Sequence, residues 1–283
     1  MATPEEHALL QEALAEIRTM RSELLASHAL IKLLAADVLF LRQPRDPKHI
    51  VRAPTHAYSQ NYEDAIIAEI YSRIGERSRI FVEIGIETGV ECNTRALLEC
   101  GWTGVWIDAN PAAIEVAKSN MAPYLKKGTL KIVEAMIAKD NVQEILSIQL
   151  DNRPIDFLSV DVDYNTSHIW RAIGATARVS CIEYNPAFPP NVEWEVPYDP
   201  DSMWDGTNRY GASLKTLERI GREKGLALVG CDFHGVNAFF VKESECGDKF
   251  LAPYTAEQHF EPPRYPLVGH RGHPANPKAI SSV

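Results

Sequence analysis

The sequence predicts an α/β fold, a Rossmann-like sheet of mostly parallel strands with helices on both faces. Two observations predict it. Short runs of β-branched and aromatic residues alternate with stretches of helical periodicity along 57–244, and such alternation is typical of parallel sheets. The last two β-rich runs are joined only by 232–236, which is too short for a crossover helix, so these two strands form an antiparallel hairpin.

Each element follows from a local pattern. β-rich runs predict seven strands, in chain order 80–84, 104–107, 130–133, 155–160, 179–183, 226–231 and 237–241. Helical periodicity before and between them predicts helices over 62–71, 94–100, 112–117, 167–175 and 214–224. Strand–helix units that finish in a hairpin are the layout of the class I S-adenosylmethionine (SAM) methyltransferases, a seven-stranded sheet ending in an antiparallel hairpin.

A helical region precedes this sheet. Thr3-Pro4-Glu5-Glu6 combines a hydroxyl cap, a proline at the first helical position and acids in the first turn, which predicts a helix start. In heptads counted from Leu10, nine of the ten a and d positions are apolar: a is Leu10, Ile17, Leu24, Ile31 and Val38, and d is Ala13, Met20, Ser27, Leu34 and Leu41. Two interpretations stay open. The region pairs with other copies through 10–41, or its apolar stripe, wider from Leu24 onward, packs on its own domain.

These patterns divide the chain into four parts. Residues 1–44 form the helical oligomerisation or packing region, and 45–56, which contains Pro47 and Pro54, forms a linker. Residues 57–246 form the predicted methyltransferase domain, and 247–283, rich in proline and histidine, an irregular C-terminal tail.

Composition narrows the class of partner. The 283 residues carry 29 Lys+Arg against 38 Asp+Glu, a net charge of −9, which argues against non-specific nucleic-acid binding. No stretch reaches the length of apolar sequence that a membrane span needs, and no secretion signal is seen. The five cysteines have no metal-binding spacing and are expected to be reduced thiols. We therefore expect a cytoplasmic protein with a small-molecule partner, with no nucleic acid and no membrane.

The first strand ends in an acidic glycine turn, Glu83-Ile84-Gly85-Ile86-Glu87-Thr88-Gly89. Glycines suit a backbone that bends sharply beside a ligand, and the G-x-G-x-x-G dinucleotide fingerprint is absent. The acid that opens the turn suits a cationic ligand such as the amino group or sulfonium of SAM. Asp108, at the end of the second strand, is placed to bind ribose hydroxyls, as in related nucleotide folds. The turn, Asp108 and the hairpin together predict SAM as cofactor.

Several motifs resemble the FkbM-type SAM-dependent methyltransferases, in the order Tyr58-Ser59-Gln60-Asn61-Tyr62-Glu63-Asp64, Phe81-Val82-Glu83-Ile84-Gly85, Asn93-Thr94 and Gly101-Trp102-Thr103-Gly104 through Pro111. The resemblance covers about 58–241 and implies O-methylation, often of sugars or natural products. It also implies the residues that line the SAM site: Gln60, Glu83, Gly85, Asn93, Asp108, Glu134 and Ala135. Asn61-Tyr62 departs from the family pattern, in which an aromatic residue is often followed by glycine.

Acidic residues follow the fourth and fifth strands. Asp161 and Asp163 leave one strand tip, and Glu183 and Asn185 leave its neighbour, so all four lie at the ligand edge of the sheet. Such oxygen ligands suit Mg²⁺, with Asp161, Glu183 and Asn185 as the predicted set. The D-x-D-Y pattern is also similar to that of the macrocin-type, metal-dependent sugar O-methyltransferases, although Asn185 stands where their pattern has a second acid. The alternative is that Asp161 contacts SAM and Asp163 caps the next helix.

Methyl transfer to a hydroxyl needs alignment and removal of a proton. Asp161, Asp163 and His168 are the candidate catalytic residues, with His234 a further candidate base. The long segment 186–211 is typical of a lid or binding loop, and aromatic faces beside polar groups suit a sugar ring. The candidate acceptor contacts are Trp194, Tyr198, Trp204, Tyr210, His234 and Asn237.

The sequence thus predicts an O-methyltransferase that uses SAM, with or without Mg²⁺, on a hydroxyl of a sugar or glycosylated small molecule. Two alternatives remain open: an N-methyltransferase on the same scaffold, and a catalytically silent SAM-fold subunit that acts through its N-terminal helix. Crowded acids at the ligand edge disfavour the silent subunit, because like charges held together cost stability unless a ligand or proton offsets them.

Overall fold

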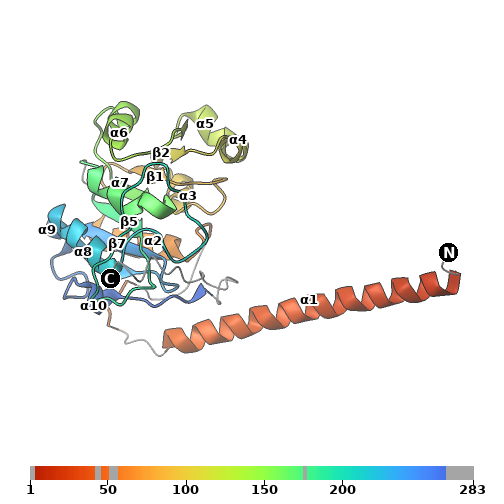
Figure 1. The fold of residues 1–283 in the computed structure, drawn as a ribbon. Helices are drawn as coiled ribbons and strands as arrows, with labels where there is room; N and C mark the ends of the chain where they lie inside the picture. Colours follow the sequence, from red (N-terminus) through yellow and green to blue (C-terminus); the bar gives the residue numbers. More distant parts are fainter. Residues whose placement is uncertain (1–3, 42–45, 51–56, 175–176, 266–283) are drawn as a thin grey trace. The chain divides into compact units, whose positions relative to one another are not determined.

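The computed structural model describes residues 4–41, 46–50, 57–174 and 177–265, which form two units. The first contains the single helix α1 (Pro4–Leu41), drawn in red in Figure 1. Its apolar heptad residues are largely exposed. Within the described ranges, no helix is both long enough and apolar enough to cross a bilayer.

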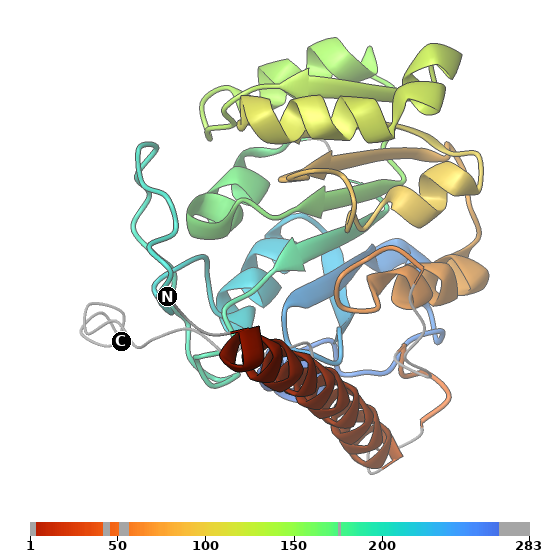
Figure 2. The same cartoon turned by 90° about the vertical axis from the view of Figure 1, so that its right-hand side faces the viewer.

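The second unit is built on one seven-stranded sheet (Figure 2). Its strands are β1 (Ile80–Ile84), β2 (Thr103–Asp108), β3 (Leu130–Glu134), β4 (Phe157–Val160), β5 (Val179–Glu183), β6 (Leu226–Cys231) and β7 (Asn237–Lys242), in the spatial order β3-β2-β1-β4-β5-β7-β6. All neighbours are parallel except the pairs that β7 makes with β5 and β6. The predicted hairpin and the class I methyltransferase fold are confirmed by this order.

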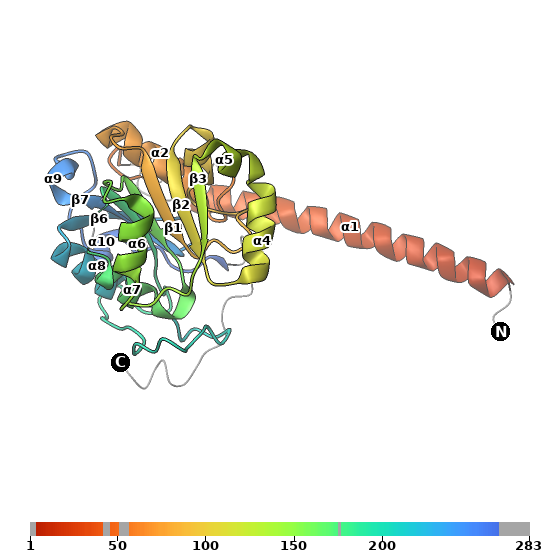
Figure 3. The ribbon, with the colours of Figure 1, turned by 90° about the horizontal axis from the view of Figure 1, so that it is seen from above.

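Helices cover both faces of the sheet (Figure 3). One face packs against α6 (Val142–Leu150), α7 (Thr166–Ala172) and α8 (Leu214–Glu223). The other packs against α2 (Glu63–Ile74), α3 (Arg95–Glu99), α4 (Pro111–Asn120) and α5 (Ala122–Lys127). The strand side chains alternate between these two cores: Val82 belongs to the first and Phe81 to the second. Burial on both faces explains why the strands read as continuous apolar runs.

The sequence did not predict α6. Its apolar residues Val142, Ile145 and Leu146 recur at helical spacing and face the core, so a signal was present. The short helix α5 was also not predicted, because the helix expected in this region covered only 112–117. Other differences are small. The helix after β4 begins with a 3₁₀ turn (Asp163–Asn165), and β4 itself begins at Phe157 rather than at Ile155.

Segments outside the predicted methyltransferase domain also pack on the body. Ile50, from the predicted linker, is buried in the core beneath β6. Within 247–265, expected as an irregular tail, Phe250 is buried and the short helix α10 (Ala256–His259) contacts α8 and β6. A further short helix, α9 (Glu243–Cys246), follows β7. The body therefore extends from the segment 46–50 to at least Arg264.

Candidate active site

The predicted site residues gather at one edge of the sheet. The carboxyl ends of the parallel strands β1, β2, β4 and β5 meet there, as the topology requires. The antiparallel strand β7 begins at the same edge, where Asn237 stands opposite Glu183 in the ladder. Residues separated by more than a hundred positions in the sequence are thereby brought together.

Gly85 joins the first strand tip to the fourth. It has φ 86°, a left-handed conformation that favours glycine, and its amide donates to the carbonyl of Ile107 at 2.9 Å. A Cβ at Gly85 would overlap the backbone carbonyl of Asp161. Gly89 is similar, with φ 73°, and a Cβ there would lie 2.8 Å from the Trp106 ring. The glycine turn is therefore required by close packing.

Glu83 holds the C-terminal end of the same loop, at Asn93 and Thr94. Its buried carboxylate accepts hydrogen bonds from the amides of Asn93 (2.8 Å) and Thr94 (3.0 Å) and from the Thr94 hydroxyl. Trp106 Nε1 in turn donates to the Thr94 hydroxyl at 2.7 Å. Burial raises the pKa of Glu83 to about 7, although these hydrogen bonds oppose the shift. The structure thus engages Glu83 in holding the loop, where the sequence predicted a cofactor contact.

Asp108 lies half-buried at the tip of β2. One carboxylate oxygen accepts from the amides of Ile86 (3.0 Å) and Glu87 (2.8 Å), and the other from the amide of Asn110 (2.8 Å). Ala135 adjoins it, because its amide donates to the Asp108 carbonyl at 2.9 Å. Asp108 therefore fixes the glycine turn against the second strand tip.

Three further predicted cofactor residues reach this edge. Glu134 is exposed at the end of β3, paired in register with Asp108. Asn93 is buried, and its side-chain amide donates to the Ser159 hydroxyl at 3.0 Å. Gln60 is exposed beside Asn61, ahead of α2.

Three carboxylates converge at the tips of β4 and β5. Asp161, Asp163 and Glu183 each offer an oxygen, and these atoms all lie within 4.8 Å of one another. Burial, and then the charge of Asp163, raises the pKa of Asp161 to about 7. Burial, and then Asp161, raises the pKa of Glu183 well above its ordinary value. Glu183 Oε2 is buried without a hydrogen-bond partner among the described residues.

Asn185, predicted as a metal ligand, is engaged elsewhere. Its Nδ2 donates to the carbonyls of Asn208 (2.8 Å) and Tyr210 (2.9 Å), and its Oδ1 accepts from the amide of Ala187 (3.1 Å). It anchors the long loop, and Asp163 stands as the third acid of the cluster. The sequence had assigned Asp163 to catalysis or to helix capping.

His168 also anchors the long loop. Its Nε2 lies 2.7 Å from the carbonyl of Val196 and its Nδ1 lies 3.5 Å from Arg171 Nη1. The Val196 carbonyl and Arg171 therefore position the ring. The sequence placed His168 among the catalytic residues because it follows the acidic strand tip, and the folded loop supplies a different role.

The aromatic residues of the loop fall into two groups. Trp194 and Tyr210 are buried, and Trp194 stacks on Phe188 with centroids 4.2 Å apart, so this group fixes the loop. Tyr198 is half-buried against His168, and Trp204 is 36% exposed. Among the four predicted acceptor contacts in this loop, only Tyr198 and Trp204 keep part of the ring accessible to a ligand.

A second acidic group was missed by the sequence. Glu63 is buried at the start of α2 and accepts from Asn237 Nδ2 (2.8 Å) and the Asn61 amide (2.7 Å). Asp232, whose pKa burial raises to about 8, accepts from the amides of the hairpin turn. Its repulsion with Glu63 adds to the shift. The adjacent acids Glu63 and Asp64 in the motif 58–64 were the sequence signal for this group. The sequence alone does not show that Glu63 lies beside the hairpin, because that contact forms only on folding.

His234 lies next to this acidic group, in the hairpin turn. It is buried, it stacks on Tyr62 with centroids 5.1 Å apart, and burial lowers its pKa to about 4. A neutral ring at physiological pH follows. Tyr62 has φ 69°, so the backbone there adopts the left-handed conformation that favours glycine.

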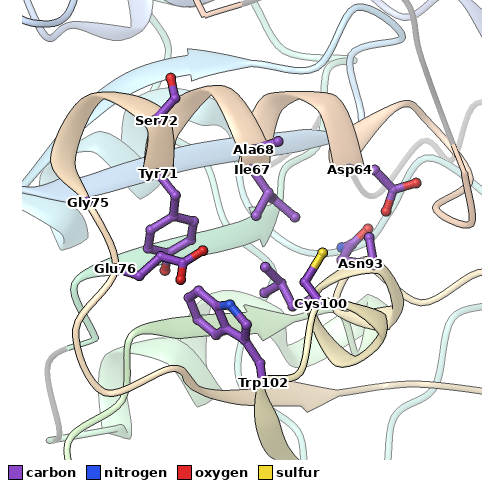
Figure 4. Close-up of a pocket in the computed structure, with 12 residues that line it drawn as sticks. Asp64, Ile67, Ala68, Tyr71, Ser72, Gly75, Glu76, Asn93, Cys100 and Trp102 are labelled. Atoms are coloured by element: carbon purple, nitrogen blue, oxygen red, sulfur yellow. The ribbon is translucent and has the colours of Figure 1, made fainter.

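A cavity of about 630 Å³ lies between α2 and α3. Figure 4 shows Tyr71 and Trp102 at one end and Asp64 and Asn93 at the other. Asn93 is the one predicted cofactor residue that lines it. The cavity therefore runs along the helix layer and reaches the candidate active site only at Asn93.

No protein-family model matches this chain, and no curated protein matches it in sequence. Solved structures do match. The pyocyanin biosynthetic protein PhzM is 15% identical, with 62% of this chain and 53% of that chain covered and a TM-score of 0.36. An O-methyltransferase from Bacillus cereus in complex with SAH is 18% identical, with 76% and 91% covered and a TM-score of 0.39. A putative RNA methyltransferase from Pyrococcus horikoshii is 11% identical, with 75% and 96% covered and a TM-score of 0.41. The chain spans about half the length of the first of these.

The raised pKa values predict how stability depends on pH. Asp161 and Glu83 (about 7) and Asp232 (about 8) bind protons in the folded state that the unfolded chain has released. Their contribution to the free energy of unfolding is therefore lost as pH rises through 7–8. His234 and His259, with pKa lowered to about 4, act in the opposite direction only below their ordinary pKa of 6.5.

We therefore expect the free energy of unfolding, measured by urea denaturation in EDTA, to fall between pH 6.5 and pH 8.5. Asp161→Asn should flatten this dependence. A stability that is constant or rises across the same window would contradict the raised pKa values.

Proposed function

We propose that this chain is a SAM-dependent O-methyltransferase acting on a hydroxyl of a sugar or glycosylated small molecule. One observation carries the proposal: a cluster of acids with raised pKa stands at the same sheet edge as the glycine turn and Asp108. The FkbM-type resemblance of the motifs, which is part of the proposal, points to the same chemistry.

The cofactor site is assigned to the tips of β1 and β2. SAM, when bound, supplies a methyl group on a sulfonium that leaves by in-line displacement. The Asp108 carboxylate, which is half-exposed, would hold the ribose hydroxyls beside the glycine turn whose amides donate to it. Glu134 and Ala135 border the same position.

The acceptor is assigned to the side of Asp161 and Glu183. With a pKa of about 7, Asp161 can accept a hydroxyl proton near neutral pH, which is the range where a general base works best. The exposed ring of Trp204 would offer flat apolar surface to a sugar ring, and the half-buried Tyr198 would border it, with the polar cluster toward the hydroxyl rim.

The acid cluster also fits a divalent cation. The cluster has three carboxylate oxygens within 4.8 Å of one another, and Glu183 Oε2 is buried with no hydrogen-bond partner among the described residues, which together make a hard-oxygen donor set. We assign Asp161, Asp163 and Glu183 as the residues that would hold Mg²⁺, in place of the predicted set with Asn185. A bound Mg²⁺ would lower the pKa of the acceptor hydroxyl, and Asp161 would then act as its ligand rather than as the free general base.

Calorimetric titration with S-adenosylhomocysteine tests the cofactor assignment. We expect saturable binding that Asp108→Asn weakens by roughly 10-fold or more, because a hydrogen bond to a charged group contributes about 1.5–3 kcal/mol. Asp248→Asn, on the exposed surface after α9, is the matched control and should bind as the unmodified chain does. A separate Mg²⁺ titration should give heat that Glu183→Gln abolishes. If S-adenosylhomocysteine binds neither with nor without Mg²⁺, the proposed function is overturned and the silent-subunit alternative is favoured.

A further inference from the structure

The helix α1 presents a long apolar stripe to solvent. Ile17, Leu24 and Ile31, at successive a positions, are 60%, 57% and 62% exposed. Met20 and Leu34, at d positions, are 67% and 54% exposed. A helix of 38 residues with so much apolar surface uncovered is not stable in water by itself, so another surface must cover the stripe.

The heptad pattern selects another α1 as that surface. The stripe repeats every seven residues along the helix, which is the pattern of a coiled-coil seam. β-branched residues hold three of the five a positions: Ile17, Ile31 and Val38. In parallel coiled coils, β-branched residues at a favour two strands. Ser27, a polar residue at a d position, would fix the register by pairing with its own copy.

Charge complementarity selects the parallel orientation. Glu16 and Glu23 occupy g positions, and Arg21 and His28 occupy e positions exactly five residues later in each case. In a parallel pair, a g residue faces the e residue five positions on in the other helix, so both acids meet a basic residue. In an antiparallel pair, g residues face g residues, which would bring the acids together.

We propose that α1 pairs with α1 of a second copy as a parallel, in-register, two-stranded coiled coil. Both chains then leave the coiled coil at the same end, after Leu41, so the two methyltransferase bodies follow from one end of the pair. The inference rests on α1 alone and is independent of the proposed activity.

Sedimentation equilibrium on the full chain tests the pairing. We expect twice the 31.6 kDa chain mass. Ile17→Glu combined with Ile31→Glu places charge in the seam and should give the monomer mass. The matched control, Ala15→Glu combined with Ser22→Glu, adds the same charge at f positions on the opposite face and should leave the dimer intact. A monomeric unmodified chain, a larger oligomer, or a dimer that survives the seam variants would overturn the proposal.

Two measurements test orientation and register. In a Cys100→Ser background, which removes the exposed native thiol, Ala13→Cys at d should form a disulfide-linked dimer on oxidation, and Ala15→Cys at f should not. Glu16→Arg alone should weaken the dimer, and adding Arg21→Glu should restore it. A dimer that neither crosslinks through position 13 nor shows this rescue would exclude the parallel arrangement.

Discussion

Asp161→Asn is expected to reduce methyl transfer by about 100-fold or more, the range that a positioned general base contributes. The substitution keeps the shape of the side chain and leaves the backbone carbonyl against Gly85 in place, so the glycine turn should persist. It removes the carboxylate that pairs with Glu183 and that has a pKa of about 7. Binding of S-adenosylhomocysteine should be nearly unchanged, because the ribose contact is assigned to Asp108.

The measurement is release of S-adenosylhomocysteine from SAM in the presence of a panel of glycosylated acceptors. Asp248→Asn serves again as the control and should retain full turnover. Glu183→Gln should lose activity to a similar extent, because the two acids share one site. Full activity in Asp161→Asn would remove the proposed mechanism, whereas loss of both turnover and binding would indicate a structural role.

Gly85→Ala is expected to destabilise the fold by about 3 kcal/mol or more, since left-handed strain and overpacking each cost about 1–3 kcal/mol. The added Cβ would occupy the position of the Asp161 carbonyl, which is backbone and can move only with β4. Urea denaturation measures the loss as a shift of the midpoint.

Gly128→Ala separates the cost of left-handed strain from the cost of overpacking. Gly128 has φ 74°, close to that of Gly85, but an added Cβ there meets open space. We expect it to lose only about 1–2 kcal/mol, the cost of the left-handed conformation. Equal losses in the two variants would show that the contact between the first and fourth strand tips is dispensable.

The outline of the fold could be predicted because its signals are local. Strand composition, the alternation with helices and the short link 232–236 depend on neighbouring residues only, and the observed sheet follows them. The helix α6 was missed although its periodicity was visible. The packing of 247–265 could not be foreseen, because it depends on a distant partner: the Tyr184 hydroxyl donates to the carbonyl of Glu261 at 2.5 Å.

In the candidate site, too, the positions set by strand ends could be predicted, whereas the contacts with distant residues could not. Strand ends predict which residues reach the ligand edge, so Asp108, Asp161 and Glu183 could be selected from the sequence. Partner choice could not be predicted: His168 follows an acidic strand tip, yet its ring is held by the Val196 carbonyl, 28 positions away. Glu63 was missed because its partner, Asn237, is 174 positions distant.

By itself the sequence determined the order of the strands, the antiparallel hairpin and the set of polar residues at the strand tips, since local periodicity and chain connectivity suffice for these. Only the tertiary structure decided which of those polar groups are already satisfied and which are left crowded. Asp161, Asp163 and Glu183 remain as the crowded set because burial and the charges of neighbouring acids raise their pKa, while hydrogen bonds to the folded loop engage Asn185 and His168.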